Sequence, residues 1–168
     1  MELKDAIFNR RSIRKYRSQN VEKNVLVELV KFGMYAPSAR NTRSWHFYII
    51  SDREKLNEVA EKHPYAKMLK SAGAAILVCG DKSIEPMEGY LALNCANACE
   101  NIMLGALESG LGTCWIAVYP REERIKLISE IFSLPEHHLP IALLAVGYPD
   151  EEKGMPERFE ENKITFIE

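Results

Sequence analysis

The chain has 168 residues, of which 46% are hydrophobic and 27% are charged, and its formal net charge at pH 7 is −2. These values are typical of a globular protein and predict a single domain spanning residues 1–168. A slightly acidic chain is not expected to have nucleic acid as its main partner, because polyanion binders are usually strongly basic.

The sequence predicts neither a secretory leader nor a membrane span. Residues 1–5 (MELKD) are charged where a signal peptide would become apolar. The longest apolar-rich run, residues 89–107, is interrupted by three asparagines and a glutamate, which makes it a poor membrane span. We therefore expect a cytoplasmic protein without a membrane partner.

The first third of the chain predicts two helices, a loop and a strand. Residues 3–10 have apolar side chains at helical spacing, and residues 10–17 then carry five cations in eight positions. A second helix is expected over residues 23–36, because the residue before Pro37 is disfavoured in a helix. A polar loop, residues 38–44, leads to a strand over residues 45–50.

The middle third is expected to contain the core. Ser51 and Glu54 have the spacing of a capping box and predict a third helix that ends at His63. Residues 74–79 predict a buried strand, and residues 89–109 predict a long helix that is apolar on most faces. Because such a helix belongs inside a structure, we expect a partner subunit to cover one of its sides.

The last third alternates strand, helix and strand before a polar tail. Strands are expected over residues 113–119 and 141–146, with an amphipathic helix over residues 121–132 between them. Residues 164–167 are strand-like but isolated by the tail, so we expect them to pair with a distant segment or another chain. The alternation alone favours an open α/β sheet, and it fixes neither strand order nor direction.

The cationic residues 10–17 are the clearest candidate binding feature. So many like charges repel one another unless an anion lies among them or water screens them. A phosphate would fit, since guanidinium groups offer paired donors and Ser12 adds a hydroxyl. The alternative is a solvated basic face without a ligand.

The sequence contains no complete motif for a metal site, for nucleotide binding or for a hydrolase. Cys95 and Cys99 could supply half a metal site, but the histidines show no matching ligand spacing, so no metal is expected. His137 and His138 are expected to be solvated. Neither a G-x-G-x-x-G, a P-loop nor a G-x-S-x-G motif occurs in the sequence.

Four ordered segments together resemble the nitroreductase family of FMN-dependent oxidoreductases. They are residues 10–14 (RRSIR); residues 36–41 (APSARN) continuing to 45–47 (WHF); residues 99–102 (CENI) with 110–116 (GLGTCWI); and residues 146–149 (VGYP) with Arg158. Each motif alone is weak, but their ordered combination covers nearly the whole chain.

The resemblance implies an α+β fold, with a mixed β-sheet flanked by helices, a long central helix and a C-terminal arm that reaches onto the partner subunit. It also implies a homodimer that holds FMN in grooves shared by both subunits. NADH or NADPH would reduce the flavin, which would then reduce a small-molecule acceptor such as a nitroaromatic or a quinone in a ping-pong cycle. The flavin carries this chemistry, so no protein group is assigned as catalytic.

The resemblance also implies a set of cofactor-binding residues. Arg10, Ser12 and Arg158 would hold the phosphate and ribityl end, with Arg11 contributing from the same turn. Arg14 and Lys67 would lie near the pyrimidine edge, where cations favour the reduced ring. The remaining positions would line the groove from the partner (Pro37, Ser38, Ala39 and Asn41) or face the ring (Trp115, Ile116, Ala117 and Val118).

Some residues differ from the family pattern, and these differences bear on which acceptors the protein would reduce. Arg43 and Ser44 stand where glutamine and proline are frequent, and Ala117 or Val118 replaces a frequent glycine. Two alternatives to the reductase remain: another FMN reaction such as dehalogenation or flavin breakdown, and a small anion- or nucleic-acid-binding module. The second predicts a colourless protein with salt-sensitive binding.

Overall fold

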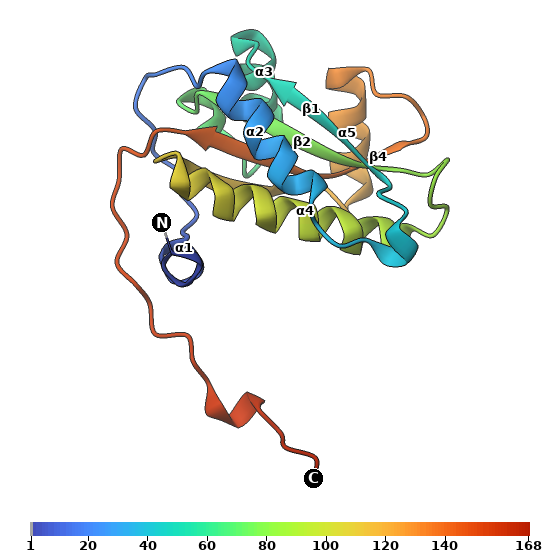
Figure 1. Cartoon of the computed structure of the whole chain (residues 1–168). Coiled ribbons are helices and arrows are strands. Elements are labelled where there is room, and N and C mark those ends of the chain that lie inside the picture. Colours follow the sequence, from blue (N-terminus) through green and yellow to red (C-terminus); the bar gives the residue numbers. More distant parts are fainter. Residues whose placement is uncertain (1) are drawn as a thin grey trace.

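The computed structural model describes residues 2–168 and alternates helices with strands (Figure 1). The helices are α1 (Leu3–Asn9), α2 (Lys23–Met34), α3 (Arg53–Lys62), α4 (Glu88–Glu108) and α5 (Glu122–Phe132), and the strands are β1 (Trp45–Ile50), β2 (Ala74–Asp81), β3 (Gly112–Ala117) and β4 (His138–Gly147). Short 3-10 turns occupy Ala39–Asn41, Lys67–Lys70 and Glu161–Lys163.

The strands form one sheet in the order β1-β2-β4-β3, and each neighbouring pair is antiparallel. The expected α+β class is thus confirmed, but these four strands do not form a mixed sheet. Within residues 2–168, parallel pairing is confined to one bridge between Ser12 and Thr113. The open α/β sheet suggested by the alternation is wrong, because parallel neighbours are absent from the four strands.

Helices cover both faces of the sheet, so the molecule has three layers. Alternate residues of a strand point to opposite faces. Ile76 and Val78 of β2 pack with α2 and α4, whereas Leu77 and Cys79 pack with α3 and α5. Since both faces are covered, β4 is buried along its whole length.

β4 begins earlier than the expected residue 141, and it includes Pro140. A proline lacks the N–H that a central strand needs and is therefore tolerated mainly at edges and bulges. The register between β2 and β4 shifts at Val78/Cys79, and Cys79 is the residue that pairs with Pro140. This irregularity accommodates the proline and brings His138 into the sheet.

Two further helix boundaries differ from the expectation. α2 ends at Met34 rather than residue 36. Asp52, not Ser51, caps α3, since its side chain accepts hydrogen bonds from the N–H groups of Glu54 and Lys55. Either residue type can cap a helix, so the sequence alone could not separate these adjacent positions.

The C-terminal segment leaves the body of the protein as an extended arm (Figure 1). Residues 164–167 do not form a strand in this chain, and Phe166 and Ile167 are 85% and 96% exposed. The predicted strand in this segment is therefore wrong for the single chain. Among the helices of residues 2–168, none has the length and apolar character needed to cross a membrane.

Candidate functional site

A pocket of about 430 Å³ lies beside the edge strand β3. Five of the predicted cofactor residues line it: Arg14, Lys67, Trp115, Ile116 and Ala117. The other lining residues are Pro64, Tyr65, Met68, Cys114 and Arg124. Segments far apart in the sequence thus bring Arg14 and Lys67 into one pocket with residues of β3.

The backbone of β3 presents polar groups to this outer edge. The Ile13 N–H donates to the Thr113 carbonyl (2.9 Å), so that carbonyl points away from β4. Because residues of an antiparallel strand alternate between the two sides, the backbone groups of Trp115 and Ala117 point the same way as those of Thr113. Their N–H groups therefore face outward at the strand edge beside the pocket.

The cationic turn is anchored by two buried side chains and one glutamate. Ile13 and Tyr16 are buried, and the Tyr16 hydroxyl donates to the Ile13 carbonyl (2.6 Å). Glu151 accepts from the N–H groups of Arg14 (2.5 Å) and Lys15 (3.2 Å). The hydrogen bond from the Arg14 N–H lowers the pKa of Glu151, so this carboxylate stays charged at neutral pH.

Carboxylates of the protein itself compensate part of the positive charge in residues 10–17. Arg10 pairs with Glu100 of α4 (3.3 Å), and Glu151 also pairs with Lys153 (3.3 Å). The sequence does not predict these two acids as partners of the cationic turn, because both lie far along the chain. The Arg14 side chain lines the pocket beside Lys67.

Arg11 and Arg158 lie away from this pocket. The Arg11 guanidinium donates to the carbonyls of Phe8 (2.8 Å) and Gly154 (3.0 Å) and thereby ties α1 to the arm. Both arginines line a separate hollow of about 260 Å³ between α1 and the arm. Ser12 lies at the β3 bridge, where its carbonyl accepts a hydrogen bond from Lys153.

The loop with Pro37, Ser38, Ala39 and Asn41 also lies outside the pocket of its own chain. Buried Asn94 of α4 holds this loop: its Oδ1 accepts from the Ala39 N–H (2.8 Å) and its Nδ2 donates to Ser44 Oγ (3.1 Å). Arg40 and Asn41 both have φ of 54°. A left-handed backbone is common for asparagine but unfavourable for arginine, so the contacts around Arg40 hold the loop in this form.

Val118 is fully buried in the core and does not line the pocket. Its N–H donates to the Ile141 carbonyl (3.3 Å). The expectation that Val118 faces a ring from β3 thus finds no geometric support. The strand ends at Ala117, and the chain turns into the core at the next residue.

Five pocket residues were not predicted as site residues, among them Arg124 and Tyr65. Arg124 donates to the Ala117 carbonyl (3.1 Å) and lies 5.1 Å from the centre of the Tyr65 ring. His63 Nε2 lies 3.2 Å from the same carbonyl, and burial lowers the His63 pKa. The cation at the start of an amphipathic helix was the available signal for Arg124, but its partner could not be read from the sequence.

The sequence pattern described as "Nitroreductase family" matches residues 7–78 and 57–148 of this chain. These two overlapping matches include the cationic turn, β3 and β4. The chain belongs to the nitroreductase family.

Relatives within the nitroreductase family support this assignment over almost the full length. A Methanothermobacter thermautotrophicus protein, provisionally named NADH dehydrogenase/NAD(P)H nitroreductase, is 40% identical over 164 residues, which are 98% of this chain and 86% of the relative. A structure from Bacteroides thetaiotaomicron with the same provisional name has a TM-score of 0.93 at 40% identity, with coverage of 98% and 96%. An "FMN-dependent Nitroreductase" from Clostridium difficile R20291 has a TM-score of 0.88 at 32% identity, with coverage of 97% and 98%.

The pocket of this member of the nitroreductase family has donors that suit the ring of a flavin. The outward N–H groups of β3 can donate to ring acceptors, and Arg14 and Lys67 can stabilise negative charge on the reduced ring. A volume of about 430 Å³ also lies within the range of small-molecule and cofactor sites. The residues of the pocket therefore fit the ring of FMN.

Proposed function

We propose that this chain is an FMN-dependent NAD(P)H oxidoreductase, a single domain over residues 1–168, that reduces nitroaromatic, quinone or similar acceptors. The observation that carries the proposal is the pairing of two cations, Arg14 and Lys67, with the outer edge of β3 in one pocket. Family membership and the FMN-dependent relative support the same cofactor. Bound FMN supplies the hydride chemistry, first accepting and then donating electrons.

The protein's own groups have binding and electrostatic roles in this proposal. Arg14 and Lys67 place positive charge where the reduced ring is negative, which makes reduction more favourable. Arg124 and Tyr65 form part of the pocket wall and are positioned to contact a donor or an acceptor. Arg10 and Ser12 remain our candidates for the phosphate end.

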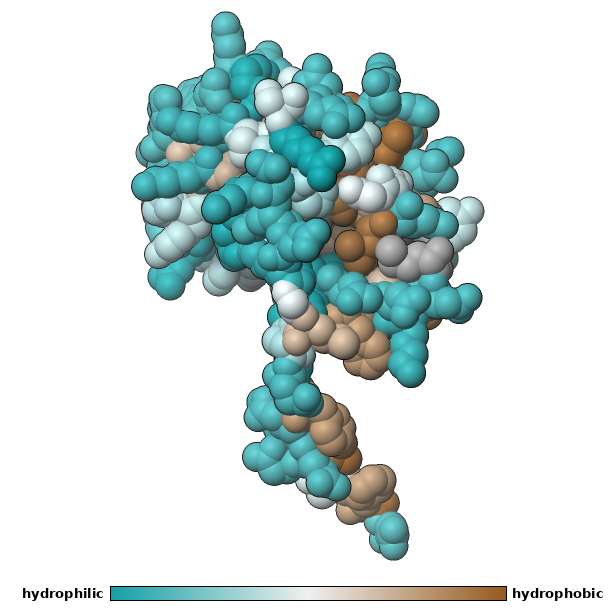
Figure 2. All heavy atoms as spheres, turned by 90° about the vertical axis from the view of Figure 1, so that its left-hand side faces the viewer, coloured by the Kyte–Doolittle hydropathy of each residue, from teal (hydrophilic) through white to brown (hydrophobic). Residues whose placement is uncertain are grey.

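We further propose that the active form is a homodimer, because the single chain does not bring all predicted cofactor residues together. The loop with Ser38 and Asn41 would complete the partner's groove, and the arm with Arg158 would lie on the partner. Figure 2 shows apolar residues along the arm and on the body beside it. α4 likewise exposes Leu93 (63%) and Tyr90 (40%), as expected for a helix that a second subunit covers.

The visible spectrum of the purified chain tests the cofactor. Equilibration with FMN followed by desalting should leave a yellow protein, and anaerobic NADH or NADPH should bleach it. A nitroaromatic or a quinone should then restore the colour. A colourless protein whose melting temperature is unchanged by FMN would overturn the proposal, whereas a yellow protein that neither NADH nor NADPH bleaches would overturn the donor and favour another FMN reaction.

Replacement of Lys67 tests the geometry of the pocket. Lys67→Gln should weaken FMN binding about tenfold and lower its midpoint potential by about 30 mV, the two-electron equivalent of about 1.4 kcal/mol. Lys70→Gln is the matched control, because Lys70 lies on the same 3-10 turn but pairs with Glu61 (3.6 Å) outside the pocket. Equal effects of the two substitutions would remove Lys67 from the site.

A further inference from the structure

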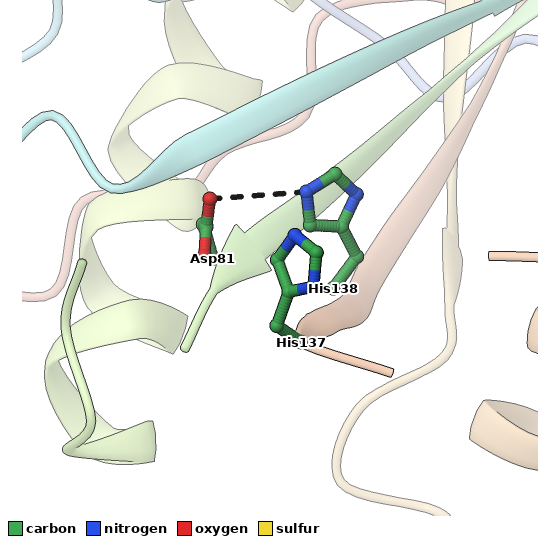
Figure 3. A group of neighbouring side chains, drawn as sticks. All are labelled: Asp81, His137 and His138. Carbon is green, nitrogen blue, oxygen red and sulfur yellow. Dashed lines mark ion pairs between the residues drawn. The ribbon is translucent and has the colours of Figure 1, made fainter. Parts of the chain in front are cut away.

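A second cluster of functional side chains lies where β2 ends and β4 begins. Asp81, His137 and His138 each offer a ligand atom, and these atoms all lie within 4.8 Å of one another. Figure 3 shows the two imidazole rings and the carboxylate gathered at this end of the sheet. None of the three residues lines the pocket beside β3.

The backbone holds these residues in fixed positions. Asp81 and His138 are register partners in the β2–β4 ladder. The Lys82 N–H donates to the His137 carbonyl (2.8 Å), and the His138 N–H donates to the Pro135 carbonyl (2.9 Å). The cluster is therefore built on paired strand ends rather than on a free loop.

Asp81 and His138 make further hydrogen bonds of the kind that orient metal ligands in proteins. Oδ1 of Asp81 accepts from the Ser83 N–H (2.9 Å) and hydroxyl (2.5 Å), while its Oδ2 lies 3.8 Å from Nε2 of His138. Nδ1 of His138 lies 2.5 Å from the Tyr48 hydroxyl. Metal-bound imidazoles commonly use their second nitrogen for such a hydrogen bond, which fixes the ring and its tautomer.

Nε2 of His138 and Oδ2 of Asp81 face each other without forming a hydrogen bond. When Nδ1–H of His138 donates to Tyr48 Oη, the Nε2 lone pair faces Oδ2 of Asp81 across 3.8 Å. That separation is too long for a hydrogen bond. It is close to the separation of about 3.4 Å expected for two ligands of a tetrahedral ion at metal–ligand distances of about 2.1 Å. The His137 side chain is exposed, so its ring is free to move a nitrogen to within coordination distance of the same ion.

We propose that Asp81, His137 and His138 form a binding site for a divalent transition-metal ion such as Zn²⁺ or Co²⁺. Imidazole nitrogen with a single carboxylate suits these borderline ions, whereas Mg²⁺ and Ca²⁺ prefer oxygen ligands. Three protein ligands leave further coordination positions to water or a small ligand. The ion clamps the ends of β2 and β4, and Ser44, whose carbonyl accepts from the Asp81 N–H (2.8 Å), links the clamp to the loop of residues 38–44.

The sequence does not predict this site, because the ligands lack a recognisable spacing. His137 and His138 are adjacent, and Asp81 lies more than fifty positions earlier. The expectation that both histidines are solvated is also wrong for His138, which is buried at the start of β4. Only the antiparallel pairing of β2 with β4 brings the three side chains together.

Metal titration of the untagged, chelator-treated full chain tests the proposal. Calorimetry with Zn²⁺ should give about one equivalent per chain, Co²⁺ should develop the visible absorption of a site with few ligands, and Zn²⁺ should raise the melting temperature because it binds the folded state. Mg²⁺ at the same concentration should show no saturable binding and should leave the melting temperature unchanged. A melting shift with Mg²⁺ equal to that with Zn²⁺, or no saturable Zn²⁺ binding, would overturn the site.

Variants identify the ligands. His137→Gln and Asp81→Asn should each raise the Zn²⁺ dissociation constant at least tenfold, and Tyr48→Phe should raise it about 10- to 100-fold through the imidazole it orients. His137 is exposed, so its replacement should leave the metal-free melting temperature unchanged. His46→Gln is the matched control: its ring lies 4.5 Å from that of His138 but outside the ligand group. An equal loss of affinity in His46→Gln, or none in His137→Gln, would overturn the assignment.

Discussion

His63 illustrates how one residue beside the pocket couples its protonation to stability. It is 1% exposed, its Nδ1 accepts from the Tyr65 N–H (3.2 Å), and Arg124 lies nearby. Burial, together with the Arg124 charge, lowers its pKa from the ordinary value of 6.5, although its contact with the Ala117 carbonyl opposes this shift. The neutral ring is therefore the form that the fold accommodates.

The pH dependence of unfolding follows from that lowered pKa. As pH falls through 6.5, the unfolded state takes up the proton first, so the free energy of unfolding should decrease. Urea denaturation at pH 7.5 and 5.5 should show this loss, and His63→Gln should make it smaller. The slope should not vanish, because burial also lowers the pKa of His138. Parallel profiles for the variant and the parent would contradict the role of His63.

Individual site residues could be predicted only where the resemblance supplied their role. The resemblance predicted Arg14 and Lys67 near the same edge of a flavin, and the structure brings both to one pocket, although they are far apart in the sequence. Arg11 belongs to the same cationic run, yet its guanidinium binds backbone carbonyls of α1 and the arm. Charge alone could not distinguish these arginines, because the direction of each side chain depends on which neighbours are buried.

At the scale of elements, the small residues of α4 allow close approach of α2. A Cβ built on Gly105 would overlap the ring of Phe32, whereas one built on Gly89 would meet nothing within 4 Å. Both glycines belong to the same helix. Comparing an alanine at Gly105 with one at Gly89 therefore separates the effect of packing from the effect of helix propensity.

Gly105→Ala and Gly89→Ala should change stability in opposite directions. Alanine gains up to about 1 kcal/mol in a helix interior, but overpacking at Gly105 should cost about 1–3 kcal/mol. We expect Gly105→Ala to lower the free energy of unfolding by about 1–2 kcal/mol. Gly89→Ala, in the first turn of α4, should raise it by less than the interior value of about 1 kcal/mol. Urea denaturation measures both, and stabilisation by Gly105→Ala would show that the Phe32 ring moves aside at no cost.

Local patterns predicted most elements but not their pairing. Helical spacing and apolar runs correctly indicated five helices and the four strands of the sheet. The start of β4 was missed because a proline ordinarily argues against a central strand, and the irregular pairing with β2 beside Pro140 cannot be seen in the sequence. The order β1-β2-β4-β3 depends on contacts between distant residues, which a one-dimensional pattern does not contain.

At the scale of the whole molecule, the arm is the feature that a single chain does not explain. Met155 and Phe159 are about 70% exposed, and the apolar residues near the C-terminus are even more so on average. Burial of such a side chain contributes about 1.5–3 kcal/mol. An arm that leaves several of them in water is therefore expected to cover, and be covered by, a second subunit.

Truncation of the arm tests this expectation. The full chain should run in light scattering at twice its mass of 19.2 kDa. A chain ending at Gly154 keeps the Arg11 contact to the Gly154 carbonyl and all strands of the sheet, so its circular dichroism should be unchanged. Its dimer dissociation constant should nevertheless rise at least about 100-fold, which corresponds to the loss of about two buried apolar side chains.

A less drastic change separates the apolar contribution of the arm from its length. The double variant Phe166→Ser, Ile167→Ser keeps the chain intact but removes the two most exposed apolar side chains near its end. If these residues are buried against the partner, this variant should also weaken the dimer, and it should lower FMN retention because part of each groove would come from the other subunit. A full-length chain that stays monomeric, or a truncated chain that dimerises as tightly as the parent, would show that the arm does not hold the subunits together. In the second case the exposed side of α4, with Leu93 and Tyr90, would be left to supply the dimer contact by itself.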